Sequence, residues 1–254
     1  MNVATKDASI DSIIEQMDTI IQRCINEKSK LGYFAVLYKG VTTEVKAKIK
    51  IGYFDDNERM QKLVIVFAGR YLDAINRFWN KEHPSKSWLV AFETTQLNSP
   101  IILQHLMLGM NAHINLDLAI ATAEVAPKES IANIKNDFNK IMNILSNMID
   151  GVKIRLESVS PSIKIFDWVG GNSDEKIAGF TINKSRDLAW NTAEKLAFAD
   201  KEQFIEKFKL HDEFVAILAK GISEPPGVLM DIGLFFIRLR EEKNTSKVIS
   251  ALLQ

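Results

Sequence analysis

The sequence predicts an all-α protein: a single compact domain of many helices around a buried central helix. Glycine and proline are scarce, at 12 and 6 of 254 residues, so few positions interrupt a helix. Apolar residues recur at spacings of three and four along almost the whole chain, as one face of a helix requires. No Pro-, Gly- or Ser-rich linker divides the chain, and its length suits one large core, so we expect one domain over residues 1–254.

Four helices are predicted before the centre of the chain, each from apolar residues that repeat on one face. The break between the third and fourth is the stretch His83-Pro84-Ser85. The predicted elements are a helix from about Ser9, a helix over about 32–49, a turn at 52–57, a helix from 56 or 57 to about 80, and a short helix over about 86–95.

The central helix is predicted to begin with Ser99 as N-cap and Pro100 at its first position, and to end near Val125. Between Pro100 and Ala123 there is no Lys, Arg or Glu. A solvated helix face normally carries such charges, so we expect this helix to be enclosed on all sides.

The second half of the chain has the same periodicity. A long loop or lid-like insertion is expected at 161–175, and the strand-like patterns "KIKIG" and "VKIRLESV" leave room for one minor hairpin. The predicted helices cover about 130–148, 154–158, 183–199, 201–219 and 227–240, with a last turn near Val248.

Charge and composition narrow the classes of partner. Lys plus Arg equals Asp plus Glu, 32 against 32, and the charges are mixed, so neither nucleic acid nor a membrane surface is an expected partner. The apolar run 227–239 is too short to span a bilayer and contains Asp231. The start of the chain does not resemble a secretory signal, which predicts a cytoplasmic protein. Cys24 is the only cysteine, which excludes an internal disulfide and a multi-cysteine zinc site.

Four polar residues stand in the apolar middle of the central helix, in the stretch "GMNAHINLDL": Asn111, His113, Asn115 and Asp117. Burying each without a partner costs about 1–3 kcal/mol, so they need hydrogen bonds, a metal or a ligand. His113 and Asp117 are four residues apart and can point to one site. We therefore take His113 and Asp117 as candidate catalytic residues, with His113 as acid or base, and Asn111 and Asn115 as candidate ligand-binding residues.

A second set of polar residues lies in "NKSRDLAWNTAE". Arg186, Asp187 and Trp190 fall within about one helical turn. Arg186 and Trp190 are candidate ligand-binding residues, with Arg186 clamping an anion, and Asp187 is a candidate catalytic carboxylate. The alternative for Arg186 is a pair with a carboxylate that locks two helices together, and Arg70, Asp73 and Arg77 form a comparable set on the third helix.

Three stretches resemble a bacterial family that is catalogued only as a domain of unknown function. They are "LYKGVTTEVKAKIKIGYFDDNERMQKLVIVFAGRYLDA", "LQHLMLGMNAHINLDL" and "INKSRDLAWNTAEKL", which together span about Tyr33 to Leu196. The resemblance implies a helical fold and no activity, and it places all seven candidate residues on family motifs. Two positions depart from the family pattern: His105 stands where an apolar residue is usual, and Ala119 replaces a proline.

Three functions stay open, and neither a cofactor nor a metal is identified. The first is an enzyme or small-molecule binder that uses a polar pocket around His113 and Asp117. The second is a non-catalytic structural or binding protein in which these side chains form an internal hydrogen-bond network. The third is a metal-dependent hydrolase, because "AHINLD" is similar to a buried-helix element of helical zinc phospholipases and nucleases, although those enzymes carry more than the four histidines found here. Its further ligands would come from Asp73, Glu93, Asp137, Asp187 or Glu194. The partner expected is a small molecule, and a homo-oligomer is compatible with the sequence.

Overall fold

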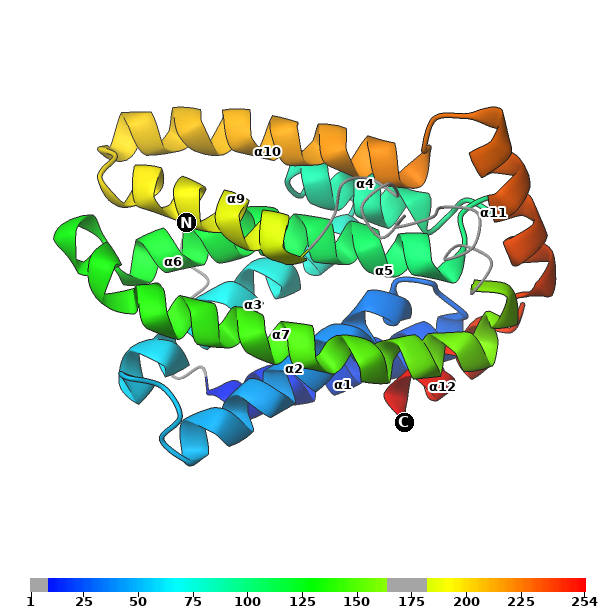
Figure 1. Cartoon of the computed structure of the whole chain (residues 1–254), viewed down its shortest axis with the longest axis horizontal. Coiled ribbons are helices and arrows are strands. Elements are labelled where there is room, and N and C mark those ends of the chain that lie inside the picture. The colour runs from blue at the N-terminus through cyan, green and yellow to red at the C-terminus, as the bar shows by residue number, and fades with distance from the viewer. Residues whose placement is uncertain (1–8, 164–181) are drawn as a thin grey trace.

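The computed structural model describes residues 9–163 and 182–254, and in these residues every regular element is helical (Figure 1). The predicted all-α fold is confirmed. The expected hairpin is not present in the described residues. "KIKIG" ends the helix α2 (Gly32–Lys50) and "VKIRLESV" lies in α7 (Ile131–Val159), because both stretches continue the apolar spacing of the helix before them.

The helices of the first half are close to those predicted. Side chains cap three of their N-termini: Ser9 before α1, Asp56 before α3 and Ser85 before α4. The bounds are Ile10–Glu27 for α1, Asn57–Trp79 for α3 and Lys86–Thr94 for α4.

The central helix is one continuous rod made of α5 (Ile102–Met110), the π-helix η1 (Asn111–Leu118) and α6 (Ala119–Val125). It packs against α2, α3, α4, α9 (Ile182–Ala197) and α10 (Lys201–Ser223). From Ile102 to Ala123 every residue is buried except Leu103 and Met110, which are half-buried. The prediction of a helix enclosed on all sides is therefore confirmed.

The predicted start of this helix is wrong by two residues. The rod begins at Ile102, not at Pro100. The side-chain oxygen of Gln104 accepts the N–H of Ile101 at 2.9 Å, and the buried carboxylate of Glu241 accepts the N–H of Ile102 at 3.0 Å. A carboxylate that lies 139 residues away in the chain thus caps the helix, which local sequence signals do not reveal.

The structure also merges two predicted helices. Apart from Ser130, the predicted helices 130–148 and 154–158 both lie in the single 29-residue helix α7, and Gly151 lies inside it. A glycine inside a helix costs only about 0.5–1 kcal/mol, which the packing of α7 offsets. Of the expected lid-like insertion at 161–175, only Pro161–Ile163 is described, as the short helix η3, and the rest lies outside the described residues.

Figure 1 shows the rod between α4, α9 and α10 on one side and α1, α2 and α7 on the other. The helix α11 (Val228–Arg240) crosses one end of the bundle, and the predicted last turn is a helix, α12 (Thr245–Leu253). A short η2 (Lys128–Ser130) joins α6 to α7. No helix in the described part of the chain has the length and apolar character needed to cross a bilayer.

Candidate functional site

The carboxylate of Asp117 lies at the meeting point of three elements. It accepts hydrogen bonds from Nε of Arg70 on α3 at 3.1 Å, from Nε1 of Trp88 on α4 at 2.8 Å, and from Nδ1 of His113 on η1 at 3.2 Å. Asp117 is 1 % exposed. A buried carboxylate needs this compensation, and the Arg70 guanidinium provides the opposite charge.

The ring of His113 is enclosed by aromatic side chains, which we call the aromatic cage: Phe34, Tyr38, Phe67, Tyr71 and Trp88. Phe67 stacks on the imidazole with ring centres 3.7 Å apart, and Tyr38 meets it edge-on at 4.0 Å. Burial lowers the pKa of His113, and the neighbouring Asp117 opposes this shift only in part. His113 is therefore neutral at neutral pH.

The partner of Nδ1 determines the tautomer of His113. Because a carboxylate oxygen accepts hydrogen bonds and does not donate them, Nδ1 of His113 carries the proton and Nε2 has a free lone pair. Nε2 is buried and has no hydrogen-bond partner among the described residues, and neither has the hydroxyl of Tyr71 in the same cage. Unpaired buried polar atoms cost about 1–3 kcal/mol each, so the described residues leave these two atoms without compensation for their burial.

Gly109 allows the aromatic cage to approach the rod closely. A Cβ atom at Gly109 would lie 2.3 Å from ring carbons of Phe34. No side chain fits there, so the small residue lets the Phe34 ring press against the backbone of α5.

The site comes nearest to solvent at Arg70 and Glu124. The side chain of Arg70 is 21 % exposed, and its Nη1 lies 3.9 Å from the Glu124 carboxylate. Burial raises the pKa of Glu124, while Arg70 opposes this shift. Arg70 therefore links the surface to the buried Asp117.

The two asparagines of the motif make bonds toward α10. Asn111 donates to the carbonyl of Val215 at 3.0 Å, and Asn115 donates to the side-chain oxygen of Asn111 at 2.9 Å. Nε2 of His211 donates to the backbone carbonyl of Asn115 at 2.7 Å. Asn111 and Asn115 thus join the π-helix to α10.

The second predicted set lies elsewhere. Nε of Arg186 pairs with Asp187 at 2.9 Å, and both side chains reach solvent. Trp190 is buried against Phe138 of α7, with the ammonium of Lys135 5.2 Å from its ring centre. These interactions are separate from the hydrogen bonds of His113 and Asp117, and the roles of Arg186, Asp187 and Trp190 in ligand binding or catalysis stay predictions.

The partners of the His113–Asp117 pair come from residues that were not sequence candidates for the site: Arg70, Trp88, Tyr38, Phe67 and Tyr71. A signal existed for part of this set. The stretch "VFAGRY" in the resemblance contains Phe67, Arg70 and Tyr71, and the sequence sets Arg70 beside Arg186 as either an anion-binding residue or part of a structural ion pair. Tyr38 lies in the first stretch of the resemblance, "LYKGV", and no comparable signal points to Trp88.

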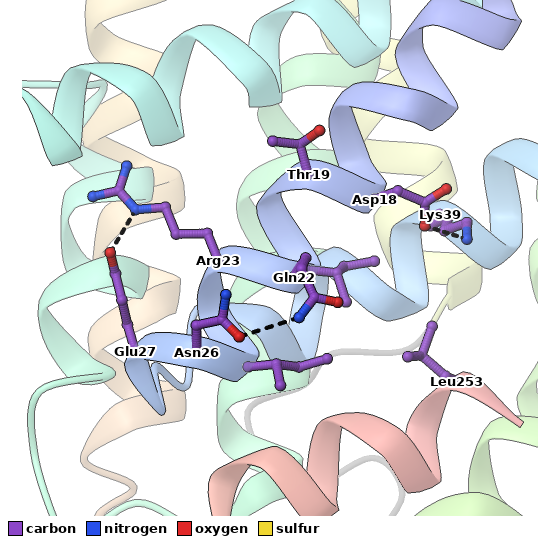
Figure 2. A pocket seen from close by; sticks show the side chains of 10 residues that line it. Asp18, Thr19, Gln22, Arg23, Asn26, Glu27, Lys39 and Leu253 are labelled. Carbon is purple, nitrogen blue, oxygen red and sulfur yellow. Dashed lines mark hydrogen bonds and ion pairs between the residues drawn. The ribbon is translucent and has the colours of Figure 1, made fainter.

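Two surface hollows are separate from this pair. One, of about 730 Å³, lies over α1, and Figure 2 shows three pairs among its polar side chains: Arg23 with Glu27, Gln22 with Asn26, and Lys39 with Asp18. The other, of about 340 Å³, is lined by residues of α2, α7 and α12 and by Leu106. Neither is lined by His113 or Asp117, so neither contributes to the candidate site.

In the described part of the chain, the side chains that could bind a metal do not lie close enough together to form a site. No group of three or more His, Cys, Asp or Glu residues is placed there to hold an ion. Asp137, one of the proposed further ligands, instead accepts the backbone N–H groups of Asp55 and Asp56 and pairs with Arg59. The alternative of a metal-dependent hydrolase therefore has no ligand set in residues 9–163 and 182–254.

Comparison with known proteins identifies a family for most of the chain. A family model with the description "Family of unknown function (DUF5995)" matches residues 10–225, which include all seven candidate residues. No curated protein and no solved structure matches the chain.

Proposed function

The chain belongs to the DUF5995 family of unknown function, and from its own site we propose that it binds a small molecule and accepts a proton from it at Nε2 of His113. The observation that carries the proposal is the unpaired Nε2 lone pair, buried among aromatic rings, with Asp117 behind the other ring nitrogen. A histidine held by a carboxylate at Nδ1 and free at Nε2 has the arrangement of a general base.

The protonation state supports this role. Burial lowers the pKa of His113, so the neutral, proton-accepting form dominates at neutral pH. When Nε2 takes a proton, Asp117 stabilises the resulting imidazolium through Nδ1–H. Arg70 and Trp88 hold the Asp117 carboxylate in position during that step through their hydrogen bonds.

The surroundings of Nε2 favour an uncharged ligand with an apolar body. The cage consists of aromatic rings, and the guanidinium of Arg70 beside it is engaged by Asp117 and lies near Glu124. The Tyr71 hydroxyl is a second polar contact within the cage. We therefore propose a small neutral molecule that donates an O–H or N–H to His113 and packs its apolar part on the rings.

Entry of the ligand requires a local opening, because Phe67 lies 3.7 Å from the imidazole and His113 is buried. The π-helix supports such a response. A π-helical turn is wide and rare, and it occurs mostly at functional sites. The segment Asn111–Leu118 carries both His113 and Asp117, so a change in its winding moves the pair directly.

A second function has its own supporting observation. Asp117 joins α3, α4 and η1 through three hydrogen bonds, which suits a purely structural network that fixes how the helices pack. In that case Nε2 of His113 has no role, and only the hydrogen bond from Nδ1–H to Asp117 contributes to the packing of the helices.

The variant His113→Asn separates the two functions, since its amide N–H can replace Nδ1–H at Asp117 while nothing replaces Nε2. We would screen a panel of small neutral alcohols, phenols and amides by thermal shift and measure the hits by calorimetry. The proposal expects binding by the parent protein and by the exposed-loop control His83→Asn, with at least a tenfold loss in His113→Asn. Equal binding by His113→Asn, or a panel without any hit, contradicts the proposal and leaves the structural network.

A further inference from the structure

The helix α11 carries a continuous apolar stripe on its solvent side. Six large apolar side chains there are each between 48 % and 78 % exposed. They are Val228, Leu229, Ile232, Phe235, Phe236 and Leu239, which we call the α11 stripe. Folded monomers rarely expose so many large apolar side chains together, so this surface calls for a partner.

The stripe follows from the helical spacing. Its residues stand at i, i+1, i+4, i+7, i+8 and i+11, and at 100° per residue they fall within an arc of about 120°. The opposite side of α11 packs on the protein: Leu234 and Ile237 are buried, and α11 contacts η3. Figure 1 shows α11 crossing the end of the bundle, and it lies beyond the residues that match the family.

We propose that the partner is a second copy of this chain, paired through an antiparallel contact between the two α11 helices. The charges beside the stripe support this orientation. Asp231 and Arg238 lie seven residues apart on the same edge of the stripe, and the chain carries no net charge.

A two-fold axis at the middle of α11 brings opposite charges together. Asp231 of each copy faces Arg238 of the other, so the ion pair forms twice. A parallel pair would instead place this edge of α11 against the opposite edge of the second copy, where Arg240 lies, so the pair of Asp231 and Arg238 would not form. Nη1 of Arg238 donates to the carbonyl of Asn98 at 2.7 Å, and the other N–H groups of the guanidinium are the donors for the second copy.

The same antiparallel register also places apolar residues of the two copies opposite each other. Ile232 lies opposite Phe236 of the second copy, and Leu229 lies opposite Leu239. The helix has 13 residues and is therefore about 20 Å long, so it supplies only part of the roughly 800 Å² per partner of a standard interface. We therefore expect a weak dimer that dissociates at about micromolar concentration.

Sedimentation velocity of the full chain between about 1 and 100 µM tests the dimer. We expect a concentration-dependent dimer for the parent protein, a monomer for Ile232→Asp, and the parent behaviour for Ile154→Asp. Ile154 is 70 % exposed on α7 and is not part of the stripe, so it is the matched control. Circular dichroism shows that each variant is folded. A parent protein that stays monomeric, or an Ile232→Asp variant that still dimerises, overturns the proposal.

Cysteine cross-linking tests the orientation, because the one native thiol, Cys24, is buried. Phe235 lies next to the proposed axis and Val228 lies at one end of the stripe. We expect Phe235→Cys to form disulfide-linked dimers under mild oxidation and Val228→Cys to form far fewer. Equal linkage at both positions indicates a parallel pair and contradicts the antiparallel contact.

Charge reversal gives a second measure of the orientation. We expect Arg238→Glu to weaken the dimer about tenfold and the double variant Asp231→Arg, Arg238→Glu to restore it. Phosphatidylcholine vesicles provide the last comparison. If the parent protein stayed monomeric and bound these vesicles, and the Ile232→Asp variant did not bind them, the dimer would be overturned. The stripe would then be assigned to a lipid surface.

Discussion

The indole N–H of Trp88 donates to Oδ2 of Asp117 at 2.8 Å, and both side chains are almost completely buried. This bond joins α4 to the π-helix across 29 residues of sequence. Asp117 uses the same oxygen to accept from His113. The orientation of the candidate base therefore depends on a helix that contributes no other hydrogen bond to the pair.

Removing the Trp88 bond is expected to destabilise the protein. Trp88→Phe keeps an aromatic ring in the core and removes a hydrogen bond to a charged group, which contributes about 1.5–3 kcal/mol. Trp190→Phe is the matched control, because Trp190 is also buried and its indole N–H has no hydrogen-bond partner in the described residues. We expect urea unfolding to give a free energy about 1–3 kcal/mol lower for Trp88→Phe than for Trp190→Phe. Equal values would show that the bond contributes nothing.

The contact between Gly109 and Phe34 predicts a packing defect. A methyl group at Gly109 would lie 2.3 Å from the Phe34 ring, so Gly109→Ala must displace that ring or the backbone of α5. We expect it to lower the free energy of unfolding by about 1–3 kcal/mol.

Gly221→Ala is the control for this substitution. Gly221 is also helical, but a Cβ atom there has no neighbour within 4 Å. We expect Gly221→Ala to be neutral or to stabilise by up to about 1 kcal/mol, because alanine favours the helix. If Gly109→Ala and Gly221→Ala changed the urea midpoint equally, the helix propensity of alanine would explain both changes. The clash with Phe34 would then contribute nothing.

The buried histidines predict a loss of stability in acid. Burial lowers the pKa of His105 to about 3, against an ordinary value of 6.5. Between these values the unfolded chain binds a proton and the folded chain does not, so stability is complete above 6.5 and falls as the pH falls. From pH 6.5 to about 5 this one group removes about 2 kcal/mol.

Urea unfolding at about pH 7.5 and pH 5 measures this effect in the parent protein and in His105→Leu. The parent should lose more stability in acid than the variant. His113 and His211 also have lowered pKa values and titrate in both proteins, so the difference isolates His105. Identical losses would mean that His105 is accessible to protons in the folded state.

The sequence predicted most helices because the signals for them are local. Apolar spacing located α1, α3 and α10 within a few residues, and the lack of Lys, Arg and Glu between Pro100 and Ala123 predicted the burial of the rod. Signals that depend on distant residues were missed. The helix α5 begins where the remote Glu241 caps it, so the Ser99-Pro100 pattern gave the wrong start.

The candidate site divides in the same way. The sequence by itself determined that Asn111, His113, Asn115 and Asp117 lie on a buried helix and need partners, because hydrophobic spacing and burial are encoded within a few turns of that helix. Only the tertiary structure decided that Asp117 is held by Arg70 and Trp88, that the segment winds as a π-helix, and that Nε2 of His113 is unpaired. A hydrogen bond across a helix interface depends on how helices far apart in sequence pack, and residue spacing within one helix carries no information about that packing.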